Sequence, residues 1–133
     1  MILQVESGGT AIDNTIGHQG FLWVRNGGVA TSTVVQSGGT AGIVEGGVAS
    51  QTGLNAYGSV YVRGTASDTI VNSKASLFVN GKGIASGVTV TSSGGLFVSE
   101  GGTAIGTVVN YGGSAHVRSG GTIINARSIP AGA

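Results

Sequence analysis

The sequence contains no cysteine and few charged, aromatic or proline residues. Without cysteine, its 133 residues can form neither a disulfide framework nor a thiolate metal site. Charged residues make up 8% of the chain and the formal net charge is +1, which gives no electrostatic basis for binding nucleic acid or an anionic membrane. No apolar run approaches the roughly 18 residues that a membrane-spanning helix needs. Aromatic residues are only 5%, so any core must be aliphatic.

Glycine, with 27 residues, is abundant, and valine, isoleucine, serine and threonine supply much of the remainder. A glycine-rich chain with so few charges could be disordered. The many β-branched residues and the positive mean hydropathy of +0.32 argue against disorder and favour strands.

The strongest pattern is an internal repeat of 19 residues. "VESGGTAIDNTIGHQG" (5–20) and "VRNGGVATSTVVQSGG" (24–39) share one arrangement, with Gly-Gly after the first strand-like segment. Its apolar positions recur at steps of 19 residues, apart from one step of 17 residues between Val62 and Val79. Three apolar columns result: Val5, Val24, Ile43, Val62, Val79, Val98 and Val117; Ala11, Ala30, Ala49, Ala66, Ala85 and Ala104; Ile16, Val35, Leu54, Val71, Val90 and Val109. The chain therefore holds seven units, the last of them incomplete.

Each unit predicts short strands separated by glycine turns. Leu22 and Val24 alternate with Trp23 and Arg25, as in a strand with one buried side. One such unit cannot bury its apolar side alone, so the units must stack and share backbone hydrogen bonds. We therefore predict an all-β fold, a parallel β-solenoid of about seven 19-residue rungs. At the usual strand spacing it is roughly 34 Å long.

The glycine pairs are interpreted as corners of this solenoid rather than as a ligand site. Glycine reaches positive φ without a clash at Cβ, and alanine fits the narrow interior beside each corner.

The acidic residues are too dispersed to form a hydrolytic site. Asp13 and Asp68 share one column and Glu45 and Glu100 another, and each pair is three rungs apart, about 14 Å. A polysaccharide-cleaving site needs two carboxylates within several ångströms of each other. His18 and His116 lie in the first and last units, so they cannot share a metal. We therefore expect no enzyme activity, no cofactor and no metal site.

One outward column is rich in aromatic residues. It lies between the two inward positions of the first strand and comprises Gln4, Trp23, Gly42, Tyr61, Phe78, Phe97 and His116. Arg25, Arg63 and Arg118 come two residues later on the same side. Such a row has the composition of contact surfaces. The candidate binding residues are Trp23, Tyr61, Phe78, Phe97 and His116 of this column, together with Arg25, Arg63 and Arg118. Two alternatives stay open: the row stabilises the solenoid by stacking, or another segment of the parent protein covers it.

A column of amides recurs at one corner, at Gln36, Asn55, Asn72 and Asn110. This spacing favours a ladder of hydrogen-bonded amides along the stack, with sugar binding as the alternative.

The repeat pattern resembles that of self-associating autotransporter adhesins, the AIDA-type passengers. The segments "GGVATSTVVQSGG" (27–39) and "GGTAIGTVVNYGG" (101–113) are closest to it, whereas the 17-residue unit around Gly64 departs from it, as does Lys82, which replaces a glycine. The resemblance implies a right-handed parallel β-helix. It also implies that residues 1–133 are a single segment of a longer passenger displayed outside a Gram-negative cell.

The resemblance further implies partners and a modification. Passengers of this kind self-associate, form biofilms and adhere to host cells or glycans. Some are heptosylated on serine or threonine by a dedicated heptosyltransferase. The candidate acceptors here are the hydroxyls expected at comparable outward turn positions: Ser32, Ser50, Ser67 and Ser86. Two other functions remain open, a spacer rod of a secreted or phage-type fibre and a carbohydrate-binding β-helix.

Overall fold

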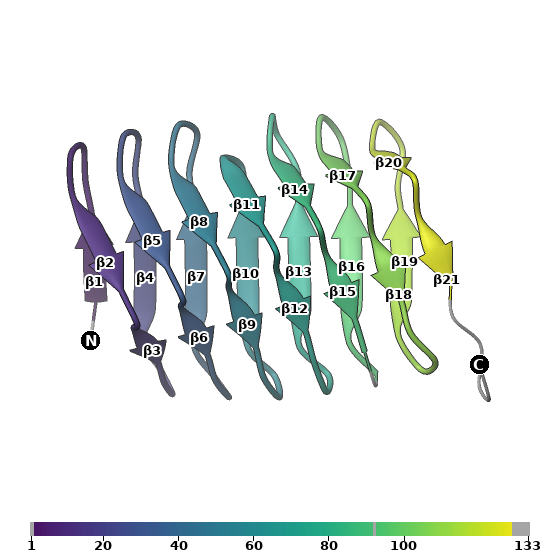
Figure 1. Cartoon of the computed structure of the whole chain (residues 1–133), viewed down its shortest axis with the longest axis horizontal. Coiled ribbons are helices and arrows are strands. Elements are labelled where there is room, and N and C mark those ends of the chain that lie inside the picture. The colour runs from purple at the N-terminus through teal and green to yellow at the C-terminus, as the bar shows by residue number, and fades with distance from the viewer. Residues whose placement is uncertain (1, 92, 129–133) are drawn as a thin grey trace.

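A computed structural model describes residues 2–91 and 93–128, which form a parallel β-solenoid of seven rungs (Figure 1). Each rung contributes one strand to each of three seven-stranded parallel sheets, here called A, B and C. The predicted fold class and repeat length are confirmed. The seventh rung has all three strands.

The strands of sheet A have four residues and those of sheets B and C have three and two. Sheet A contains β1 (Ile2–Val5), β4 (Phe21–Val24), β7 (Thr40–Ile43), β10 (Ser59–Val62), β13 (Ser76–Val79), β16 (Gly95–Val98) and β19 (Ser114–Val117). Sheet B contains β2 (Thr10–Ile12), β5 (Val29–Thr31), β8 (Val48–Ser50), β11 (Thr65–Ser67), β14 (Ile84–Ser86), β17 (Thr103–Ile105) and β20 (Thr122–Ile124). Sheet C contains β3 (Thr15–Ile16), β6 (Val34–Val35), β9 (Gly53–Leu54), β12 (Ile70–Val71), β15 (Thr89–Val90), β18 (Val108–Val109) and β21 (Arg127–Ser128).

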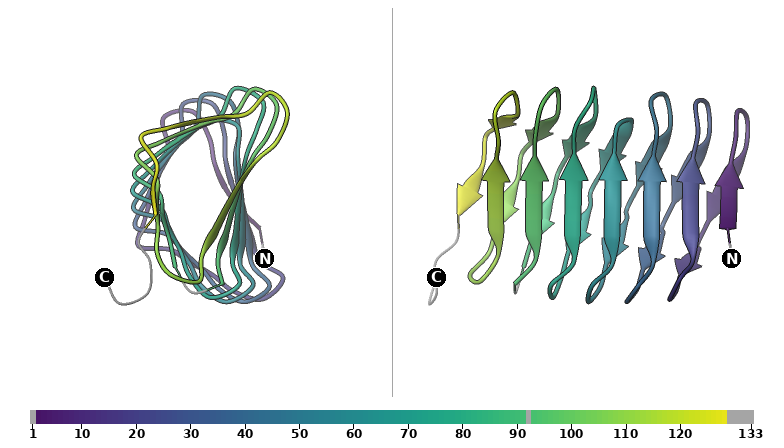
Figure 2. Two further views of the ribbon diagram at one scale, coloured as in Figure 1. Left: turned by 90° about the vertical axis from the view of Figure 1, so that its right-hand side faces the viewer. Right: turned by 180° about the vertical axis from the view of Figure 1, so that it is seen from behind.

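Viewed along its axis, the solenoid has a flattened cross-section (Figure 2). Sheet A forms one wall, and sheets B and C follow one another along the opposite wall (Figures 1 and 2). The first described strand, β1, and the last, β21, lie at opposite ends of the rod (Figure 1). Every strand side chain therefore points either into a thin interior or out from a wall.

The interior is the aliphatic column structure that the repeat predicts. Val24, Ala30 and Val35 of the second rung are all 0% exposed, and the same columns stay buried through the central rungs. Equivalent residues of successive rungs are paired in every sheet, and Ala66 of the 17-residue unit pairs with Ala49 and Ala85. The two residues that this unit lacks are therefore missing from a corner and not from a strand. In the last rung Val117 is 49% exposed because no described rung covers it.

The paired glycines at the corner between sheets A and B serve two different purposes. The first of each pair has positive φ, for example 84° at Gly27 and 88° at Gly46, as predicted. The second glycine does not need positive φ. A Cβ at Gly47 would lie 2.5 Å from the carbonyl oxygen of Val24 in the rung before it. The second glycine is therefore required by close backbone approach between rungs, which the repeat pattern did not predict.

In two rungs the corner between sheets A and B has a different structure. In rung 4 only Arg63 and Gly64 connect β10 to β11, and both backbone N–H groups donate to the carbonyl of Ile43. The resulting loop is visibly shorter than its neighbours (Figure 1). In rung 5, Lys82 takes the place of a glycine, and the positive φ moves to Gly81, where it is 59°.

A column of buried threonines faces the interior between sheets B and C. Thr33, Thr52, Thr69 and Thr107 are at most 3% exposed, and their Oγ1 atoms have no hydrogen-bond partner among the described residues. Rung 5 has Val88 at this position, 0% exposed. Because valine has nearly the same shape, the column does not need its hydroxyls for packing.

We expect Thr69→Val to stabilise the protein by about 1 kcal/mol, since an unpaired buried hydroxyl costs about 1–3 kcal/mol. Urea denaturation of the variant and the parent measures the difference. Val88→Thr is the reciprocal control and should destabilise by a similar amount. A loss of stability in Thr69→Val would show that these hydroxyls are satisfied.

Candidate contact surface on sheet A

The outward face of sheet A carries the aromatic column that the sequence predicts. Strand register places Gln4, Trp23, Gly42, Tyr61, Phe78, Phe97 and His116 side by side on successive rungs. This position alternates with buried ones because it is the third residue of each four-residue strand. We call this set the aromatic row.

Four rings of the aromatic row form a continuous stack. The ring centroids of Tyr61 and Phe78 are 4.9 Å apart, those of Phe78 and Phe97 are 5.1 Å apart, and those of Phe97 and His116 are 5.0 Å apart. The interplanar angles are 10°, 17° and 10°. Each aromatic pair of this kind is worth about 0.5–1.5 kcal/mol beyond its buried area. Stacking along the rod therefore stabilises the solenoid. It does not bury the whole row, since Tyr61 remains 45% exposed.

The row is interrupted at Gly42. On the other side of this gap Trp23 stacks on Phe21, with ring centroids 6.3 Å apart and an interplanar angle of 4°. Phe21 was missed in the sequence interpretation. Its signal was available, because it lies two residues before Trp23 and so on the same side of the strand.

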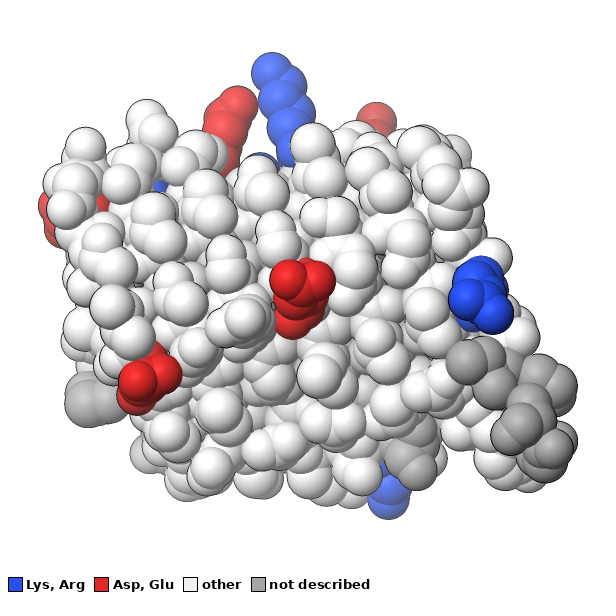
Figure 3. All heavy atoms as spheres, in the orientation of Figure 1, with Lys and Arg blue, Asp and Glu red and all other residues white. Residues whose placement is uncertain are grey.

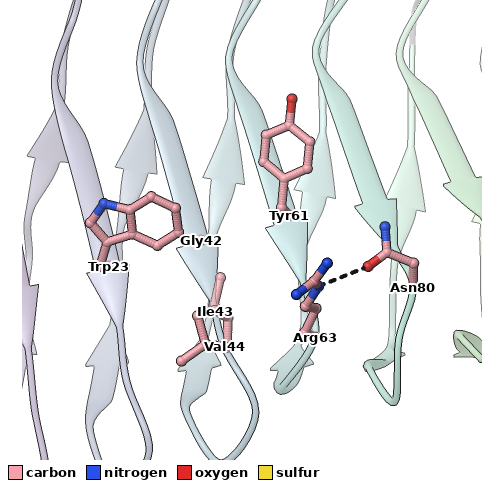
Figure 4. A pocket seen from close by; sticks show the side chains of 7 residues that line it. All are labelled: Trp23, Gly42, Ile43, Val44, Tyr61, Arg63 and Asn80. Atoms are coloured by element: carbon pink, nitrogen blue, oxygen red, sulfur yellow. Dashed lines mark hydrogen bonds between the residues drawn. The ribbon is translucent and has the colours of Figure 1, made fainter.

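The gap forms a hollow of about 320 Å³, lined by Trp23, Gly42, Ile43, Val44, Tyr61, Arg63 and Asn80 (Figure 4). Arg63 Nε donates a hydrogen bond to Asn80 Oδ1 at 3.4 Å. Of the three predicted arginines, this one alone lines the hollow. Arg25 and Arg118 follow β4 and β19, in the second and last rungs.

The candidate acceptor serines lie on the opposite wall. Ser50, Ser67 and Ser86 occupy one column at the ends of β8, β11 and β14. Ser32 is not in that column, because Thr31 is the residue paired with Ser50. Ser32 lies one residue further, at the corner, with φ 59°, and its Oγ donates to Gln51 Oε1 at 3.1 Å. The prediction that all four serines are comparable is wrong for Ser32. All four side chains are half-buried.

The amide column forms part of the predicted ladder. Asn72 Nδ2 donates to Asn55 Oδ1 at 3.4 Å, and Thr91 Oγ1 donates to Asn72 Oδ1 at 2.8 Å. At the same corner, Lys74 Nζ lies 5.8 Å from the centroid of the Tyr57 ring. These contacts hold the corner between sheets C and A.

Charged groups are sparse on the wall formed by sheets B and C (Figure 3). Asp13 and Asp68 occupy one column at the corner between these sheets, both with positive φ, and three rungs separate them.

Within residues 2–91 and 93–128, no cluster of three or more histidine, aspartate or glutamate residues could hold a metal. That part of the chain also has no helix long and apolar enough to cross a membrane.

Comparison with known proteins finds one family model that matches the beginning of the chain. Residues 2–39 match the family model "Adhesin of bacterial autotransporter system, probable stalk". The predicted resemblance to autotransporter adhesin repeats is thus confirmed on the first two rungs. No curated protein matches the chain significantly.

Among solved structures, the chain is similar to the TibC-catalyzed hyper-glycosylated fragment of TibA. The two share 23% sequence identity over 96% of this chain and 87% of that chain, with a TM-score of 0.43.

Proposed function

We propose that this chain, whose first two rungs match an autotransporter adhesin stalk repeat, is a non-enzymatic stalk segment that associates side by side with copies of itself. It would belong to a longer passenger on the outside of a bacterial cell. The aromatic row on sheet A is the proposed contact surface.

The observation that carries this proposal is the stack from Tyr61 to His116, whose two end rings are exposed and whose two middle rings are half-buried. Aromatic rings and arginine are enriched at protein interfaces, and this row places them on one straight wall. Rings on four successive rungs, from Tyr61 to His116, let two rods form several weak contacts at once. Such contacts combine into useful avidity without any single strong site.

Replacing Trp23, Tyr61 and Phe97 together by serine should abolish clumping of cells that display the chain. The purified variant should sediment as a monomer at concentrations where the parent chain associates, because the contact surface loses its anchors. Circular dichroism confirms that the fold survives. The matched control replaces Ile12, Ile84 and Ile105, which are exposed on sheet B, by serine.

Clumping that persists in the aromatic variant and disappears in the isoleucine variant would refute the proposed surface and assign it to sheet B. Loss of adherence to host cells without loss of clumping would also refute it, because the row would then bind a receptor.

We further propose that serine hydroxyls on sheet B accept heptose from a heptosyltransferase. The support is the column formed by Ser50, Ser67 and Ser86, whose outward hydroxyls repeat on three successive rungs. Mass spectrometry of the chain co-expressed with such an enzyme should show heptose on these three peptides. Ser32 should carry less, because its hydroxyl already donates to Gln51. Unmodified peptides throughout would contradict the proposal.

A further inference from the structure

The hollow at Gly42 has the features of a small-ligand site. We propose that it binds a single sugar ring carrying a carboxylate, a uronic acid unit, with the ring between Trp23 and Tyr61 and the carboxylate on Arg63. The hollow lies within the aromatic row, but binding of the sugar does not require the chain to self-associate.

The shape of the hollow comes from one missing side chain. In rungs 4 to 7 the aromatic row has one ring on every rung, and in rung 3 Gly42 contributes none. The indole of Trp23 extends over this glycine. It can do so because Gly42 has no Cβ, and a Cβ there would overlap the indole ring. The remaining space faces Tyr61 on the next rung (Figure 4). A ring bound there would lie between two aromatic side chains and continue the row.

Arg63 and Asn80 lie together on one side of this space (Figure 4). Arg63 follows β10 directly, and its guanidinium projects between Tyr61 and Asn80 (Figure 4). The hydrogen bond to Asn80 uses Nε of Arg63. The two terminal nitrogens of the guanidinium form the planar fork that suits a carboxylate. Asn80 adds an amide that can bind sugar hydroxyls.

A second hollow of about 380 Å³ adjoins the first, and Arg63 and Val44 line both. It is also lined by Lys82, Gly81 and Glu45, and it lies where rung 4 has its shortened corner. Lys82 adds positive charge near Arg63, whereas Glu45 opposes a second carboxylate. The surroundings therefore favour one carboxylate rather than a polyanion.

The chain has a built-in reporter for this site, since Trp23 is its one tryptophan. We expect sodium glucuronate to change the tryptophan fluorescence of the chain saturably, in the millimolar range. Glucose and sodium acetate at matched ionic strength should bind with less than about a tenth of this affinity, because each lacks one of the two recognised features.

Two variants test the residues. Arg63→Gln should weaken glucuronate binding at least about tenfold, because the charge-assisted pair is lost. Arg118→Gln is the matched control: it removes an arginine from the same column, outside the hollow, and should bind as the parent does. Gly42→Phe should fill the gap and abolish binding. Calorimetry is the measurement for that variant, because a ring beside Trp23 alters its emission.

The proposal is supported if glucuronate binds the parent and Arg118→Gln but not the other two variants. An equal response to acetate would overturn it in favour of a simple anion site. An equal response to glucose would overturn the role of Arg63. Equal binding by Gly42→Phe would overturn the location, and no binding by the parent would overturn the site. Self-association of the parent, measured in the same samples, distinguishes the two proposals: a parent that associates without binding glucuronate overturns only the sugar site.

Discussion

Gly47→Ala is expected to destabilise the protein by about 3 kcal/mol or more. The new Cβ would lie 2.5 Å from the carbonyl oxygen of Val24 and 3.0 Å from its carbonyl carbon. Those atoms belong to the backbone of the preceding rung and take part in the inter-rung ladder, since Val44 N–H donates to that same oxygen at 2.9 Å. They can move only by separating the two rungs, so the overlap is more costly than ordinary overpacking of about 1–3 kcal/mol. Thermal and urea unfolding measure the loss.

The first rung offers a matched control, because no described rung precedes it. At Gly9, which occupies the same position, an added Cβ would approach the carbonyl oxygen of Glu6 at 3.0 Å and the Val5 side chain at 3.6 Å. Gly9→Ala should therefore cost less than about 1 kcal/mol. Equal losses in the two variants would show that turn conformation, and not contact between rungs, accounts for the second glycine.

Leu77→Ala is expected to destabilise the protein by about 3–5 kcal/mol. Leu77 is 0% exposed in the fifth rung of sheet A, with Val60 before it and Leu96 after it. Truncation leaves a cavity between two rungs whose separation is fixed by backbone hydrogen bonds, so the site cannot collapse to fill it. The midpoint of urea denaturation should fall, with little change in its slope.

Leu3 occupies the same column in the first rung, where it is only half-buried. Leu3→Ala should therefore cost about 1 kcal/mol. The column itself contains Ala41 in rung 3, so alanine is compatible with its backbone. A loss in Leu77→Ala no greater than that in Leu3→Ala would mean that the interior rearranges around the missing atoms.

The columns of the fold could be predicted from the sequence because a solenoid repeats its environment at every rung. Val24, Ala30 and Val35 recur at the same spacing since each meets the same neighbours above and below. The outward row, from Trp23 to His116, followed from strand alternation alone. Even the 17-residue unit could be aligned, since Ala66 remained in its column.

Features that depend on how two rungs approach each other could not be predicted in this way. The contact of Gly47 with the Val24 carbonyl and the shift of positive φ to Gly81 depend on backbone positions in space. The position of Ser32, in contrast, could have been predicted correctly, because the 19-residue repeat aligns Ser32 with Gln51 and aligns Thr31 with Ser50. The hollow at Gly42 was visible in the sequence only as a missing aromatic, and its walls depend on the direction of the Trp23 indole.

The shortened corner of rung 4 bears on how such a chain can evolve. Two residues are missing there, yet the strands on either side pair with both neighbouring rungs without any slip. Insertions and deletions at this edge are thus absorbed locally and do not propagate along the rod. Loops of new length can be acquired there one at a time, giving related proteins different decorations on an unchanged backbone scaffold.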